Sequence, residues 1–215
     1  MRISELSQRA GVPVPTIKYY LREGLVPPGA SRGRTQADYG DEHVERLRLI
    51  RTLIEVGGLA IADVRAVVAA VDDESLSLHA AFGVAHDAIT PRHGLGDDGE
   101  RAAAHKVIDD LVDTVGWQVR DESQARELLA DALVMLSRRD LGPSPDDLLP
   151  AAAAAQTRAR ADLEAVPTDV ARSEAVEYIV IGTLAGEVIA NALRRLAQEH
   201  ESSLRFDPPP DARRP

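Results

Sequence analysis

Three polar side chains that could contact nucleic acid lie close together near the start of the chain. Thr16, Lys18 and Tyr19 fall within one short predicted helix. A threonine offers a hydroxyl or a methyl group to a base edge, a lysine reaches a phosphate or a guanine, and a tyrosine hydroxyl donates to a phosphate oxygen. The pattern therefore predicts a helix that contacts DNA. The alternative is that the tyrosines are core residues, which is the role we expect for Tyr20.

A second basic group follows in a segment that cannot be helical. Residues 27–34 contain two prolines, two glycines and the arginines Arg32 and Arg34. Closely spaced Pro and Gly residues favour a hairpin or a loop. We expect this segment to form a small β wing that carries both arginines.

The elements that must position these side chains are two short helices joined by a tight turn. We expect Ser4 to cap the first helix and Gly11 to end it. The second helix should run over residues 14–23 and end at Gly24, with Pro15 in its first turn, where a missing N–H has no helical partner to lose. This layout matches a helix-turn-helix.

The rest of the chain is predicted to be helical. Apolar residues make up 44% of the chain and aromatic residues only 3%, which favours aliphatic helix packing in an all-α fold with a small β wing. We predict a DNA-binding domain over residues 1–74, a helical domain over 75–206 and a disordered tail over 207–215. The further helices are expected over residues 41–56, 61–71, 76–89, 101–115, 121–139 and 168–200, with one more starting at Ser144 and kinked or restarted at Pro150.

Charge divides unevenly along the sequence. The whole chain has a net charge of −10. Residues 2–34 carry six basic and two acidic side chains, whereas residues 76–215 carry 15 basic and 24 acidic ones. The two parts should therefore face different partners.

Motifs for catalysis and metal binding are absent from the sequence. There is no Gly-rich phosphate loop, no nucleophile elbow and no paired-histidine motif, so we do not expect an enzyme or a cofactor. His79, His86 and His93 recur every seven residues, but a seven-residue step along a helix is about 10.5 Å, too far to share one metal ion. The chain has no cysteine, which excludes disulfides and thiolate sensing. With no apolar signal region and no long uncharged run, a cytoplasmic, nucleoid-associated location without a membrane partner is expected.

The first third of the chain resembles the DNA-binding domain of the MerR family. The resemblance is carried by Ile3-Ser4-Glu5-Leu6, Gly11-Val12, Thr16-Ile17-Lys18-Tyr19-Tyr20, Arg22-Glu23-Gly24-Leu25-Val26-Pro27-Pro28, Tyr39, residues 44–51 and residues 57–64. It implies a sequence-specific transcriptional regulator that binds double-stranded promoter DNA as a homodimer and affects RNA polymerase indirectly, by distorting the promoter spacer. The DNA contacts implied are Ser4, Pro15, Thr16, Lys18, Tyr19, Arg22, Arg32, Arg34 and Tyr39.

The sequence also departs from the family pattern. Lys18 stands where arginine is common, and Pro15 stands where a polar side chain is usual, so the family's base specificity does not carry over. The long antiparallel dimerisation helix of the family should follow residue 72, but residues 76–89 are too few to form it. Dimerisation is therefore expected to have moved to the C-terminal helices.

The last predicted helix has apolar residues on two faces. One face should pack within its own bundle and the other against a second subunit. The alternative is the central helix of a monomeric bundle. The bundle is only loosely similar to the dimerising domain of TetR-type regulators. The predicted dimer interface consists of Ile181, Leu184, Ala185, Val188 and Ile189.

A small apolar effector is the expected ligand of the C-terminal helices. Ligand pockets are mostly apolar with a few polar anchors, and Trp117 and Tyr178 are candidates to line one. Either residue could instead be plain core. The alternative function is a DNA-tethered protein-interaction module without a small-molecule ligand.

Overall fold

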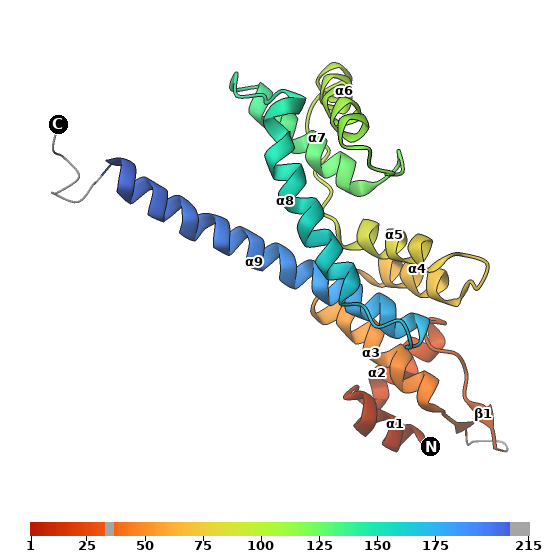
Figure 1. Cartoon of the computed structure of the whole chain (residues 1–215). Helices are drawn as coiled ribbons and strands as arrows, with labels where there is room; N and C mark the ends of the chain where they lie inside the picture. The colour runs from red at the N-terminus through yellow and green to blue at the C-terminus, as the bar shows by residue number, and fades with distance from the viewer. Residues whose placement is uncertain (33–36, 207–215) are drawn as a thin grey trace, which may run out of the picture.

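The computed structural model describes residues 1–32 and 37–206. This part of the chain is helical apart from one small sheet, as predicted, and the all-α fold with a wing is confirmed. The wing and helices α1 to α3 lie at one end, α6 and α7 lie at the other, and α4 and α5 lie between them (Figure 1). Helix α9 begins beside α3, crosses the end of α8 and then extends away as an arm. The elements are α1 (Ile3–Ala10), α2 (Val14–Arg22), β1 (Ala30–Ser31), β2 (Ala37–Asp38), α3 (Asp41–Glu55), α4 (Ile61–Asp72), α5 (Leu78–Ile89), α6 (Asp98–Val115), α7 (Gln124–Ser137), α8 (Pro145–Glu164) and α9 (Arg172–Phe206).

Two local predictions are corrected, one about the cap of α1 and one about a kink in α8. Helix α1 has Arg2 at its N-cap and makes no side-chain cap hydrogen bond, so Ser4 lies inside the first turn and is not the cap. Helix α8 continues through Pro150 without a break, contrary to the predicted kink or restart. Pro150 is close to the start of this helix, whose first turn is held by reciprocal hydrogen bonds between Ser144 and Asp147. The helical bond lost at Pro150 therefore falls near a well-capped end.

The main hydrophobic core joins the two ends of the sequence. Side chains from α1 to α4 pack with Ala81 and Ala85 of α5 and with Val176, Ile179 and Val180 of α9. All five of these residues are buried. The predicted boundary at residue 74 stays a prediction, but hydrophobic packing continues across it.

Polar contacts fix the start of α9 on this core. The Arg172 guanidinium donates to the backbone oxygens of Ala70 at 3.0 Å and Leu76 at 2.8 Å. One turn further along, Thr52 Oγ1 donates to Glu177 Oε1 at 2.7 Å. These bonds tie α9 to α3 and to the end of α4, so the helix cannot rotate without breaking them.

A second, smaller core lies between α6, α7 and α8. It includes Ile108, Leu133 and Val134. Beside it, the buried carboxylate of Asp131 accepts hydrogen bonds from the backbone N–H of Leu95 at 2.8 Å and from Arg101 at 2.9 Å. Burial raises the pKa of Asp131, but these hydrogen bonds together lower it below its ordinary value. The ionised Asp131 thereby holds the loop that enters α6.

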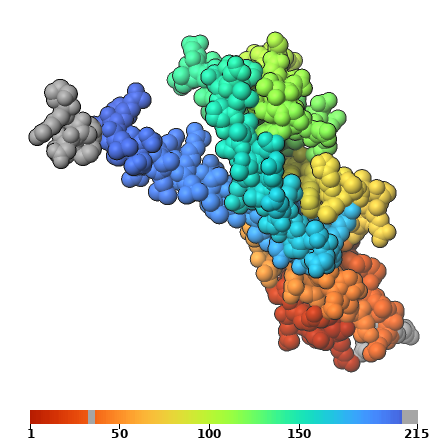
Figure 2. Space-filling view, viewed as in Figure 1, coloured from red at the N-terminus to blue at the C-terminus, as the bar shows by residue number. Residues whose placement is uncertain are grey.

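The second half of α9 stands clear of the other helices (Figure 2). By length and composition alone, α9 is apolar enough to cross a membrane, which is weak evidence for a single helix. Its first half packs into the main core through Val176 and Val180, so at least part of its apolar surface serves protein packing. The absence of a membrane partner stays a prediction.

His86 gives the contact between α5 and α9 a predicted pH dependence. Its Nε2 lies 3.2 Å from Thr183 Oγ1, and burial lowers the pKa of His86 below its usual 6.5, with smaller, opposed effects of Asp87 and Arg120. The unfolded chain therefore binds this proton more tightly, and stability falls as the pH drops through the unfolded pKa. When the pH is lowered from about 7.5 to about 5.5, we expect the melting temperature of His86→Gln to fall less than that of the wild type.

The matched control for this measurement is His79→Gln, because His79 lies exposed on the same helix. Its pH dependence should equal that of the wild type in thermal denaturation followed by circular dichroism. Equal losses in the wild type and in His86→Gln would show that His86 does not couple folding to pH.

Candidate nucleic-acid interface

Helices α1 and α2 meet at a turn that requires glycine. Gly11 has a φ of 67°, in the left-handed region, and a Cβ at this position would lie 2.6 Å from Nη1 of Arg51. The same Arg51 atom donates to the backbone oxygen of Ala10 at 3.3 Å. The turn is therefore closed by α3 as well as by its own backbone, and it sets the direction of α2.

Helix α2 has one buried and one outward face. Ile17 and Tyr20 are buried in the core, which confirms the core role expected for Tyr20, and burial raises the pKa of its hydroxyl. Lys18 is exposed, whereas Thr16 and Tyr19 are half-buried. The outward face of α2 thus presents Thr16, Lys18 and one side of Tyr19.

Tyr19 is held in place by its neighbours. Its ring centroid lies 5.7 Å from that of Tyr20 and 5.9 Å from the Arg22 guanidinium carbon. Packing of this kind restricts the ring without burying it completely. Tyr19 and Arg22 can therefore present their polar groups together at the end of α2.

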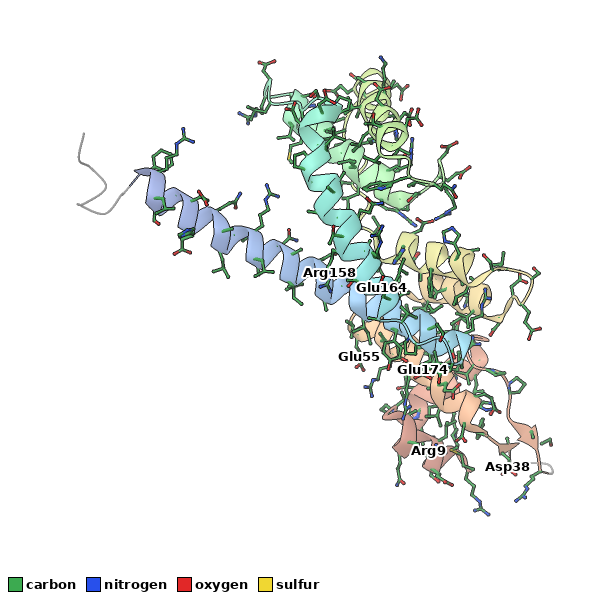
Figure 3. The ribbon with its side chains drawn as sticks, viewed as in Figure 1. Arg9, Asp38, Glu55, Arg158, Glu164 and Glu174 are labelled. Carbon is green, nitrogen blue, oxygen red and sulfur yellow. The ribbon has the colours of Figure 1, made fainter. Side chains whose placement is uncertain are left out.

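The wing is a short antiparallel hairpin tied to the N-terminus. Ala30 pairs with Asp38 and Ser31 with Ala37. The Met1 ammonium donates to the Tyr39 backbone oxygen at 2.7 Å. This contact fixes the base of the wing beside α1, and Figure 3 shows Asp38 in the wing and Arg9 on α1 at the same end of the molecule.

The residues predicted to contact DNA from the wing differ in exposure and contacts. Arg32 is exposed and pairs with Asp38 of β2 at 2.7 Å. Arg34 lies outside the described residues. Tyr39 is buried, with its ring edge-on to His43 at 5.2 Å between centroids. The ring of Tyr39 therefore belongs to the core, and we leave it out of the proposed interface.

The remaining predicted contacts lie on the surface of the same end. Ser4, Pro15 and Arg22 are all exposed. Arg2, which sequence reasoning counted only as part of the basic segment, is also exposed. Arg2 directly follows Met1, which anchors the wing. The structure therefore adds Arg2 to the basic side chains beside α1.

The candidate effector residues do not share a pocket. Trp117 lines a cavity of about 830 Å³ between the end of α6 and α8. Tyr178 lines a different cavity of about 370 Å³ with Glu45 and Arg48 of α3. A single effector pocket containing both aromatic residues is therefore wrong.

Most residues of the predicted dimer interface are exposed on α9. Val188 and Ile189 are 70% and 50% exposed, and Ile181 and Ala185 are exposed as well. Leu184 instead packs against the main core of its own chain. Leu184 is thus partly covered by its own chain, and the dimer interface stays a prediction.

A helix-turn-helix with an adjacent hairpin wing is a DNA-binding fold, and the outward face of α2 carries the side chains that such folds use. Residues 1–71 match the MerR HTH family regulatory protein domain. The HTH-type transcriptional regulator ZntR homolog of Haemophilus influenzae is 38% identical over 50 residues, which is 23% of this chain and 37% of that protein. The chain thus matches little more than a third of the length of that relative.

A solved structure matches nearly the whole chain. The crystal structure of the proposed transcriptional regulator SCO5550 from Streptomyces coelicolor A3(2) is 36% identical, with a TM-score of 0.72 over 96% of this chain and 98% of that one. The protein described here belongs to the MerR family of transcription regulators. Family and solved structure both point to a regulator rather than to an enzyme.

Proposed function

We propose that this protein binds two half-sites of a promoter element as a homodimer and controls transcription from it in the cytoplasm, at the nucleoid. The orientation of α2 carries the proposal, because Ile17 and Tyr20 fix the helix in the core and leave Thr16 and Lys18 outward. A helix so placed can enter the major groove while the wing arginine Arg32 reaches the backbone. Distortion of the promoter spacer would then decide whether RNA polymerase engages.

Dimerisation is proposed to use the exposed face of α9. Val188, Ile189, Leu193 and Leu196 are each at least half exposed and follow one another along the arm. In proteins most helical stability comes from the packing of an apolar face, so an arm of this kind needs a partner surface. A second copy supplies such a surface with the same apolar residues.

An effector is proposed to bind between α6 and α8, in the cavity lined by Trp117. The loop that lines this cavity continues to Arg120, whose guanidinium donates to Asp87 of α5 at 2.7 Å. Helix α5 in turn packs on α4 and α9. A ligand that moves this loop therefore acts on a helix that belongs to the main core.

A second candidate function is a protein-interaction module without a ligand. The exposed apolar residues near the end of α9, Leu204 and Phe206, favour it. Thermal shift separates the two functions, because an effector at 100 times its dissociation constant stabilises the protein by about 2.7 kcal/mol. A protein partner recovered by pull-down, with no stabilising small molecule, would support the interaction module.

Footprinting on the DNA upstream of the protein's own gene tests the proposed function. We expect two protected half-sites with centres about 34–36 Å apart or a multiple of that distance, as two-fold symmetric readers produce. Failure to bind any promoter fragment at low ionic strength would exclude the proposal.

The wing contact has its own prediction. Arg32→Ala should reduce the slope of log affinity against log salt by about 0.9 per subunit, because each neutralised phosphate releases counterions. Electrophoretic mobility shift at several salt concentrations measures this slope. Arg139→Ala is the matched control, since Arg139 is exposed at the end of α7, remote in sequence from the wing. An unchanged slope in Arg32→Ala would show that Arg32 does not touch phosphate.

A further inference from the structure

A cavity of about 390 Å³ lies where α5, the start of α9 and the connection between α8 and α9 meet. Leu78 and Phe82 of α5 form one wall, and residues of the connection, which spans 165–171, form another. Figure 3 labels Glu164 at the end of α8 and Glu174 near the start of α9, on either side of this connection. Small-molecule pockets commonly measure about 300–1,000 Å³, so the cavity has room for a small ligand.

The cavity is apolar except at two residues. Its connection contributes the apolar side chains of Val166, Pro167 and Val170. Thr168 supplies a hydroxyl, and Arg172 supplies the one charge. No acidic residue of the described chain lines the cavity. Apolar walls with a single cationic side chain suit a ligand that has a hydrophobic body and one negative charge.

Backbone oxygens hold the guanidinium of Arg172 in place. Its terminal nitrogens donate to the oxygens of Ala70 at 3.0 Å, Leu76 at 2.8 Å and Ser77 at 3.2 Å. Arg172 forms no salt bridge within residues 1–32 and 37–206. These bonds therefore fix the position of the positive charge without neutralising it.

A donor of Arg172 is also left without a partner. Its Nε is buried and has no hydrogen-bond acceptor, which is unfavourable for a buried N–H. Asp73 does not supply one, because its carboxylate accepts from the backbone and the hydroxyl of Ser75. Those hydrogen bonds lower the pKa of Asp73, and Arg172 adds a smaller effect in the same direction. A negatively charged acceptor would satisfy both the charge and the Nε of Arg172.

We propose that this cavity binds a small amphipathic carboxylate. The hydrophobic body of the ligand lies against Phe82 and the connection, and its carboxylate accepts a charge-assisted hydrogen bond from Arg172 Nε. The hydroxyl of Thr168 donates a second one. This site goes beyond the proposed function and does not depend on the cavity lined by Trp117.

A ligand in this cavity would strengthen the packing of α9 on the helices that precede it. Arg172 and Ala175 belong to α9, and Leu78 and Phe82 belong to α5. Arg172 also holds the end of α4 through Ala70. A molecule seated among these residues removes apolar surface of both α5 and α9 from water. Binding should therefore stabilise the folded chain.

Two probes with the same phenylbutyl body and opposite charge test the site. We expect 4-phenylbutyrate to bind the full chain, without DNA, at least about 10-fold more tightly than 4-phenylbutylammonium in isothermal titration calorimetry, because only the carboxylate gains from Arg172. It should also raise the melting temperature. Equal binding of the two probes, tighter binding of the ammonium, or binding of neither would overturn the inference.

Two variants locate the bound carboxylate. Thr168 is exposed, so Thr168→Glu should leave the fold intact while placing a fixed carboxylate beside Arg172, and the two probes should then bind about equally. Arg172→Gln should remove the preference by removing the charge, with its fold checked by circular dichroism. If Arg172→Gln does not fold, Thr168→Glu decides, and an unchanged preference in that variant would contradict the site.

Two control variants should keep the preference for 4-phenylbutyrate. Ala161→Glu adds the same charge at an exposed position of α8 that does not line the cavity. Trp117→Ala alters the proposed effector cavity, which Trp117 lines, and leaves Arg172 unchanged. Loss of the preference in either control would place the carboxylate outside this cavity and overturn the inference.

Discussion

Val188→Asp is expected to convert the proposed dimer into monomers and to weaken operator binding by about 100-fold or more, because two linked half-site contacts exceed a single one by a factor of about 10²–10⁴. Val188 is 70% exposed on the free face of α9. A carboxylate placed there would be buried without a partner in the dimer. Sedimentation velocity measures the association, and mobility shift measures the affinity.

The control for this prediction is Gln198→Asp, which adds the same charge at an exposed position on the same arm. At about 100° per residue, residue 198 lies about 80° around the helix from residue 188, on the side opposite to Ile189, Leu193 and Leu196. This variant should remain dimeric. Persistent dimers in Val188→Asp would place the subunit contact elsewhere.

Lys18→Glu is expected to weaken operator binding by about 30-fold or more, because it removes one contact worth about 1–3 kcal/mol in each of two half-sites and adds repulsion from the phosphates. Lys18 is exposed on the outward face of α2. The substitution leaves the core intact, so the circular dichroism spectrum and the melting temperature should not change. Mobility shift at constant salt gives the affinity.

The other lysine of the chain supplies the control. Lys106→Glu makes the same charge change at an exposed position on α6, away from the helix-turn-helix. Its operator affinity should stay close to that of the wild type. If both variants bound DNA equally well, α2 would not be the helix that contacts the operator.

Local signals in the sequence were sufficient to predict the DNA-binding end. Gly11 and Gly24 mark the ends of α1 and α2, and both adopt the left-handed conformation. The three-residue spacing of Ile17 and Tyr20 puts both on one face of α2, which leaves Lys18 on the other. The helix ends and the buried face of α2 each depend on residues close together in the sequence, so the sequence alone predicts them.

Contacts between distant segments could not be predicted in this way. The helical spacing of Val176, Ile179 and Val180 indicates a buried face of α9 but not the element that covers it. Thr52 and Glu177, which hydrogen-bond across this contact, are 125 residues apart in the sequence. Their pairing depends on how the whole bundle closes.

The proposed effector site shows the same limit. The position of Trp117 becomes informative only when the loop that carries it folds between α6 and α8. Tyr178 and Trp117 were grouped because both are rare aromatic residues. Composition gives no information about distance, and the two line different cavities.

The place of α9 in the main core has a consequence for synthesis on the ribosome. Val176, Ile179 and Val180 complete a core that begins with Leu6, yet they are translated after most of the chain. While they are still in the exit tunnel, the nascent N-terminal segment has an uncovered apolar surface on α3 and α5. The N-terminal helices therefore reach their final packing only after the start of α9 has left the exit tunnel.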